Sequence, residues 1–149
     1  MQKNVLDAGV FVEGRVATGV TTPGVAREAR LPPEGLPGVE IMAPGGRWLE
    51  KARATAQKTG DLDVLSPADL EVVALALEIG GIVVTSDFAV QNVARAAGLE
   101  VEPLGKSIRK GIEWAWYCPA CGRTTPRGGR KGECGVCGTE MKRRPRKGK

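Results

Sequence analysis

An α/β fold with a mostly parallel central sheet, followed by a small four-cysteine module, is the architecture that the sequence predicts. Short apolar runs alternate with segments of helical pattern over residues 1–103, which favours a parallel sheet with right-handed crossovers. Two Cys-x2-Cys pairs follow in a glycine-rich, basic region. A chain of 149 residues has room for one domain with its own core and for a module too small to fold by burial alone.

The first part of the alternation begins with an apolar run at residues 4–6, which predicts a buried strand. Residues 10–12 continue the apolar pattern into a turn and a short helix. A second helix is expected to start at residues 21–23, because proline is favoured at the first helical position, and to reach residue 28. Between residues 31 and 46, half of the 16 residues are Gly or Pro, so we expect a loop with one strand candidate at 39–42.

The second part has clearer boundaries. Good helix formers at residues 47–58 precede Gly60, a plausible C-cap. Ser66 as N-cap and Pro67 at the first position predict a helix that stops at Gly80-Gly81. A β-branched strand at 82–85, a helix at 88–97 and a last strand at 100–102 complete the pattern.

Charge is distributed unevenly along the chain. Residues 1–105 carry 9 Lys/Arg and 14 Asp/Glu, a net charge of −5, whereas residues 106–149 carry 13 and 3, a net charge of +10. This asymmetry favours an acidic site that gathers cations beside a basic surface that gathers phosphates, although a basic tail can also serve solubility alone.

The composition also excludes some chemistry. The chain has no histidine, so histidine-pair ribonuclease chemistry and Ser-His-Asp hydrolysis are excluded. It contains no run of 18 apolar residues, and we expect a soluble, cytoplasmic protein that is neither secreted nor anchored in a membrane.

Four acids lie where strands end or helices begin: Asp7, Glu28, Asp69 and Asp87. Each has an ordinary explanation, as a turn residue, a solvated charge, the capping partner of Ser66 and an N-cap, respectively. If they converged on one crevice, however, their mutual repulsion would call for a cation, and Mg²⁺ or Mn²⁺ prefers oxygen ligands. Such ions can activate water for phosphodiester hydrolysis without histidine.

These acids lie in segments that resemble the PIN-domain nucleases. The similar segments cover about the first 103 residues: Val5-Leu6-Asp7, Thr21-Thr22-Pro23 with Glu28, Ser66-Pro67-Ala68-Asp69 and Val84-Thr85-Ser86-Asp87. Residues 88–94 and the appended cysteine module resemble, more specifically, the archaeal type of the Nob-one family, which finishes the 3′ end of small-subunit ribosomal RNA. The resemblance implies a three-layer α/β/α PIN-like fold.

The resemblance also implies roles for single residues. Asp7, Glu28, Asp69 and Asp87 would hold the catalytic Mg²⁺ or Mn²⁺, with the hydroxyl of Thr85 or Ser86 in support. Asn92 would be a minor ligand or an RNA contact. Asp61 and Asp63 would be either solvated loop charges or residues close to RNA.

The cysteine module has the spacing of a metal site. Cys118 and Cys121 form one pair, and Cys134 and Cys137 form the other after 12 intervening residues. Two such thiolate pairs can complete a closed tetrahedral Zn²⁺ site, which would be structural because no coordination position stays open. Structural disulfides or a redox pair are the alternatives.

The basic residues of this region are candidate RNA contacts. They are Arg123, Arg127, Arg130, Lys131, Lys142, Arg143, Arg144 and Arg146. Trp114, Trp116 and Tyr117 could stack on unpaired bases, or they could pack the small module and its junction with the first domain.

The predicted organisation is therefore a nuclease domain at 1–103, a linker at 104–112, a zinc ribbon at 113–143 and a basic tail at 144–149. The function that the resemblance implies is metal-dependent endoribonuclease cleavage of single-stranded precursor RNA of the small ribosomal subunit. A toxin-type PIN ribonuclease and a non-catalytic RNA-binding assembly factor are the alternatives. The fused ribbon argues against the toxin-type ribonuclease, and the presence of all four acids argues against the assembly factor.

Overall fold

A parallel five-stranded sheet forms the centre of the first domain in this computed structural model, which describes residues 2–14, 17–104, 114–122, 132, 134, 136 and 138–145. The strands are β1 (Asn4–Leu6), β2 (Gly19–Thr21), β3 (Val39–Ile41), β4 (Ile82–Thr85) and β5 (Glu100–Pro103). They are arranged in the order β3-β2-β1-β4-β5, and each neighbouring pair is parallel. The predicted α/β class is confirmed.

The helices connect these strands. They are α1 (Ala8–Val12), α2 (Pro23–Glu28), α3 (Gly46–Thr59), α4 (Pro67–Ile79) and α5 (Phe88–Ala96), with a 3-10 turn η1 (Leu62–Val64). The local signals act as expected: Gly60 and Gly80 end α3 and α4 in the left-handed conformation, and Ser66 caps α4.

The second helix has Pro23 at its first position and ends at Glu28, as predicted, but the residue before its cap belongs to an unexpected strand. Residue 21 belongs to β2, and Thr22 is the N-cap of α2, its hydroxyl accepting from the Val25 amide at 3.2 Å. The strand β2 was not expected, because three residues including a glycine give almost no periodic signal.

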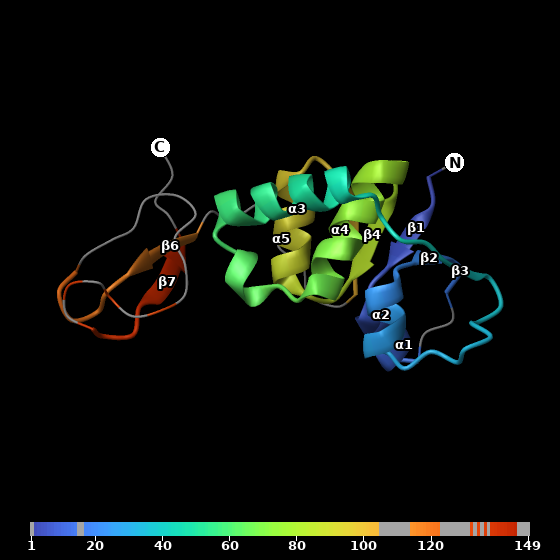
Figure 1. Ribbon diagram of the computed structural model, residues 1–149, viewed down its shortest axis with the longest axis horizontal. Coiled ribbons are helices and arrows are strands. Elements are labelled where there is room, and N and C mark those ends of the chain that lie inside the picture. Colours follow the sequence, from blue (N-terminus) through green and yellow to red (C-terminus); the bar gives the residue numbers. More distant parts are fainter. Residues whose placement is uncertain are drawn as a thin grey trace.

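The two faces of the sheet are covered differently. Val5, Val20 and Val83 point into the main core, which α2, α4 and α5 close, and α3 packs across α4 and α5 (Figure 1). Leu6 and Val84, on the opposite face, pack with Val10 of α1. Both faces therefore carry helices. In the part of the chain that the structure describes, no helix is long and apolar enough to cross a membrane.

The C-terminal module contains an antiparallel hairpin of β6 (Trp114–Tyr117) and β7 (Lys142–Pro145). Most of the predicted linker, from residue 105 to 112, lies outside the described residues. The strand β7 continues through residues 144 and 145, which the sequence had suggested as the start of a tail.

Candidate active site

The centre of the sheet brings two of the predicted acids together. The strand order reverses between β1 and β4, which are hydrogen-bonded neighbours. Asp7 follows β1 directly and its amide donates to the carbonyl oxygen of Val84 at 3.0 Å, while Asp87 follows β4 after one intervening residue. In open parallel sheets, ligands bind beyond the carboxyl ends of the strands at this reversal point.

Asp7 is the most shielded of the four acids, with 4% of its surface exposed. Its Oδ2 accepts from the Thr85 hydroxyl at 2.5 Å and its Oδ1 accepts from the Ala8 amide at 2.8 Å. The same Thr85 hydroxyl accepts from the Asp87 amide at 3.0 Å. One buried hydroxyl thus fixes the positions of both acids relative to each other, whereas Ser86 is exposed.

Asp69 and Asp87 are helix caps and also members of the cluster. Asp69 Oδ2 accepts from the Ser66 amide at 2.8 Å in a capping box, and Asp87 Oδ1 accepts from the Ala89 and Val90 amides at 2.8 and 3.3 Å. Capping occupies one oxygen of each carboxylate. The bonds from the backbone amides leave the other oxygen of each carboxylate for a ligand, so the capping role does not exclude a metal role.

The electrostatics link all four acids. Burial raises the pKa of Asp7 above its usual value against the opposing effect of the Thr85 and Ala8 hydrogen bonds, and the neighbouring Asp87 and Glu28 carboxylates raise it further. Burial likewise raises the pKa of Asp69 to about 6, with Asp7 and Asp87 adding to the shift. Glu28 itself is exposed on α2. A cluster of carboxylates that disfavour one another's ionised form is suited to a divalent cation.

The raised pKa of Asp69 predicts a pH dependence of stability. Between the usual pKa of 3.8 and the folded value of about 6, the folded protein binds this proton more tightly than the unfolded chain does. The stabilisation from Asp69 is therefore complete below about pH 4 and is lost as the pH rises to about 6. Urea unfolding of the metal-free protein measures the free energy of unfolding across this pH range. The wild type should lose stability relative to Asp69→Asn as the pH rises. If the two proteins have parallel pH profiles, the pKa of Asp69 is not raised.

Asp61 and Asn92 belong to a second, separate cluster. Asp61 has no exposed surface, and its Oδ2 accepts from the fully buried Asn92 amide at 2.7 Å. The interpretation of Asp61 as a solvated charge is wrong, because the end of α3 and helix α5 enclose it. The side chain of Asn92 thus donates to a buried acid and does not point into solvent. Asp63, by contrast, is exposed.

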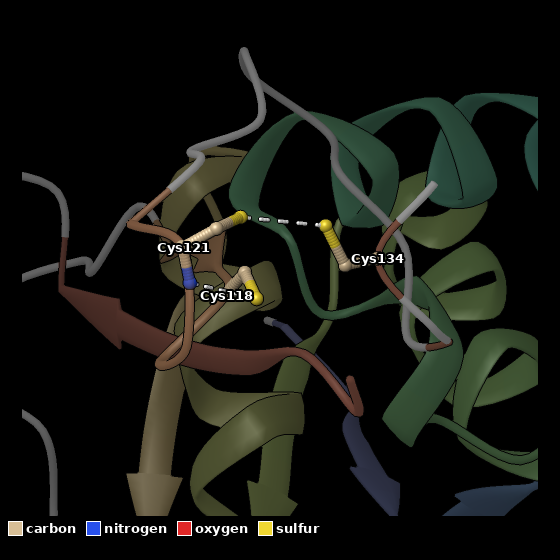
Figure 2. Close-up of side chains that lie close together, drawn as sticks. All are labelled: Cys118, Cys121 and Cys134. Carbon is tan, nitrogen blue, oxygen red and sulfur yellow. Dashed lines mark hydrogen bonds between the residues drawn. The ribbon is translucent and has the colours of Figure 1, made fainter. Parts of the chain in front are cut away.

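Three of the four cysteines converge in the ribbon (Figure 2). The ligand atoms of Cys118, Cys121 and Cys134 all lie within 4.8 Å of one another, and the described residues show no disulfide among the three. Cys137 lies outside the described residues. This cluster could hold a metal ion and fits a zinc ribbon.

The backbone of the two cysteine turns is alike. The Gly122 amide donates to the Cys118 carbonyl oxygen at 2.8 Å, and the Gly138 amide donates to the Cys134 carbonyl oxygen at 2.9 Å. Both glycines have a positive φ, 77° and 76°, which other residues rarely adopt. The Cys121 amide lies 3.5 Å from the Cys118 sulfur (Figure 2), as in turns that orient a thiolate toward a metal.

The predicted RNA contacts are only partly described. Arg123, Arg127, Arg130, Lys131 and Arg146, and the side chains of Trp114 and Arg144, lie outside the described residues. Lys142 is exposed, whereas Arg143 binds Asp61 at 2.9 Å. Trp116 is 4% exposed and packs with Met141 and two cysteines, which favours packing over base stacking for this residue.

Known proteins resemble both parts of the chain. Residues 5–79 match the family model of the PIN domain of ribonuclease. The chain is 40% identical to endoribonuclease Nob1 of Pyrococcus abyssi over 97% of its own length and 95% of that protein. It is 30% identical to endoribonuclease Nob1 of Methanocaldococcus jannaschii over 97% of its length and 78% of that protein.

A ribonuclease with a different name also matches the first domain. The chain is 38% identical to ribonuclease VapC1 of Thermoplasma acidophilum over 72% of its length and 55% of that protein. The two Nob1 matches given above, by contrast, cover 97% of the chain and therefore include the cysteine module. The chain therefore belongs to the archaeal Nob1 endoribonucleases, whose nuclease part is a PIN domain.

Proposed function

We propose that the chain cleaves single-stranded precursor RNA at the 3′ end of the small-subunit ribosomal RNA, using a divalent cation held by Asp7, Glu28, Asp69 and Asp87. Membership of the Nob1 endoribonucleases supports the reaction class. The observation that carries the site assignment is the buried Asp7 carboxylate, whose pKa is raised by burial and by two further acids beside it. As part of the same proposal, the chain would act in the cytoplasm, on its proposed ribosomal substrate.

The carboxylates suit a hard divalent cation by their chemistry, but within the described residues no three of them place an oxygen within 4.8 Å of one another, so water would complete the coordination. Asp69 and Asp87 each use one oxygen as a helix cap and leave the other for a ligand, and Thr85 holds Asp7 in place through a hydroxyl hydrogen bond. Bound Mg²⁺ or Mn²⁺ would supply Lewis-acid activation of water and neutralise charge on the phosphodiester. The capping bonds restrict the carboxylates to one orientation, so the RNA phosphate would meet a preformed site. Hydrolysis of the phosphodiester would leave 3′-hydroxyl and 5′-phosphate ends.

The cysteine cluster has a structural role in this proposal. Cys118, Cys121 and Cys134, completed by Cys137, would hold Zn²⁺ with no open position. The ribbon would then keep its basic residues on a folded hairpin, where they can bind RNA phosphates. The RNA would be cleaved at the four acids of the PIN domain.

The test is cleavage of a short RNA that spans the mature 3′ end, with and without Mn²⁺. We expect one cut at the mature end that requires the cation. Cleavage of unrelated single strands at the same rate would favour a toxin-type ribonuclease, and binding without any cleavage would favour an assembly factor.

RNA affinity should depend on the C-terminal region. Each phosphate neutralised on a single strand contributes about −0.7 to the slope of log K against log salt. Truncation after Gly105 removes a region of net charge +10, so it should weaken binding and flatten the slope. Filter-binding titrations at several salt concentrations measure both, and unchanged affinity after truncation would place the RNA site on the PIN domain.

A further inference from the structure

A buried carboxylate of the PIN domain holds an arginine of the ribbon, 82 residues further along the chain. Asp61 follows Gly60, the left-handed C-cap of α3, and has no exposed surface. On β7, Nη1 of Arg143 donates to Asp61 Oδ1 at 2.9 Å and lies 3.5 Å from the Gly60 carbonyl oxygen. The hairpin correspondingly lies beyond the C-terminal end of α3 (Figure 1).

The surroundings of Asp61 are arranged for a cationic partner. Thr59 Oγ1 and Asn92 Nδ2 donate to Oδ2 at 2.8 and 2.7 Å, so the PIN domain itself satisfies this oxygen. Both donors are neutral and leave the charge of the carboxylate uncompensated, which is unfavourable away from water. The guanidinium on Oδ1 supplies the opposite charge, and the carbonyl groups at the C-terminal end of α3 attract it further.

The ribbon fixes the same arginine from its own side. Arg143 pairs with Trp116 across the hairpin, and Trp116 packs with Cys118, Cys134 and Met141. The hairpin that carries the arginine is therefore built on the cysteine cluster. Its neighbour Lys142 is exposed.

We propose that Arg143 is a positioning residue whose ion pair with Asp61 latches the ribbon to the PIN domain in one orientation. Asn92, the other side chain on this carboxylate, belongs to α5, the helix that Asp87 caps. The latch thus connects the ribbon to a helix that carries one of the four acids at its N-cap. RNA held by the ribbon would then reach these acids along a fixed path. This consequence rests on the proposed nuclease function, whereas the latch itself does not.

Nuclear spin relaxation of the full-length, zinc-loaded protein tests the latch without RNA. In the wild type, amides of the PIN domain and of the ribbon should share one rotational correlation time. Arg143→Gln should give the ribbon a shorter correlation time than the PIN domain, and Arg143→Lys should restore part of the coupling. Lys142→Gln is the matched control, because it removes the same charge from the adjacent exposed position and should leave one shared correlation time.

Zinc content and the amide spectrum of the ribbon confirm that each variant is folded. If Arg143→Gln disturbs the hairpin, Asp61→Asn breaks the pair from the PIN side and should release the ribbon in the same way. Separate correlation times in the wild type would overturn the proposal. A shared correlation time in both pair variants would also overturn it.

RNA-binding measurements distinguish a positioning role of Arg143 from a direct contact between Arg143 and an RNA phosphate. An RNA long enough to reach both parts benefits from their linkage, so Arg143→Gln should weaken its binding by about tenfold or more while leaving a short oligonucleotide unaffected. Lys142→Gln, as a lost phosphate contact, should weaken both and reduce the salt slope by about 0.7. Equal weakening of both RNAs by Arg143→Gln would overturn the positioning role. A latched wild type that cuts no RNA would overturn the proposed function alone.

Discussion

Asp87→Asn should reduce RNA cleavage by more than about a hundredfold while leaving RNA binding and the fold in place. Loss of a group that merely orients a metal ligand costs about 10- to 100-fold, and loss of a ligand carboxylate should cost more. Asn caps a helix about as well as Asp, so its side-chain oxygen can keep the bonds to the Ala89 and Val90 amides. The substitution therefore removes one negative charge from the group of four acids and changes little else.

Single-turnover cleavage at saturating Mn²⁺, run beside an RNA-binding titration, measures this effect. Asp63→Asn is the matched control, because it makes the same change at an exposed acid of η1 and should cut at the wild-type rate. If Asp87→Asn also cuts at nearly the wild-type rate, Asp87 is only a helix cap, and the assembly-factor interpretation gains support.

Cys118→Ser should unfold the ribbon while the PIN domain keeps its own unfolding transition. The ribbon core in the described residues consists of Trp116, Met141 and two cysteines, which is too small to fold without a staple. Structural zinc contributes about 10–16 kcal/mol to the folding of small zinc modules at neutral pH. The purified wild type should contain one zinc per chain, and the variant should lose the metal together with the ribbon amide dispersion.

Elemental analysis measures the loss of zinc, and the amide spectrum measures the loss of ribbon structure. Val136→Ser, an exposed position between the cysteines of the second pair, should retain metal and fold. Wild-type protein that contains no zinc when it is purified without chelator would refute the zinc assignment, as would a Cys118→Ser variant with an unchanged ribbon spectrum.

The positions of Asp7, Asp69 and Asp87 in the fold were predictable because their signals are local. Ser66 and Pro67 mark the start of α4, so they also fix the position of Asp69 in the first turn. Asp7 and Asp87 follow β-branched or apolar runs, and parallel strands bring their carboxyl ends to one edge. The resemblance to a nuclease family then united residues whose single explanations were ordinary.

The features that the sequence did not reveal depend on distant partners. The strand β2 is short and exists through pairing with β1 and β3; a side chain on Gly19 would collide with the Asn4 carbonyl oxygen. Asp61 has the local sequence of a solvated loop charge after a helix-ending glycine. Its burial depends on Asn92 and Arg143, which lie 31 and 82 residues away.

A Mn²⁺ titration that follows bound metal and RNA cleavage in the same samples tests the acidic metal centre most directly. Electron paramagnetic resonance reports bound Mn²⁺, and the wild type and Asp7→Asn are compared at neutral pH. We expect cleavage by the wild type to rise in parallel with metal binding, and Asp7→Asn to lose both the tight binding and the cleavage, since Asp7 adjoins the other acids. Wild-type metal binding and cleavage in Asp7→Asn would contradict the account.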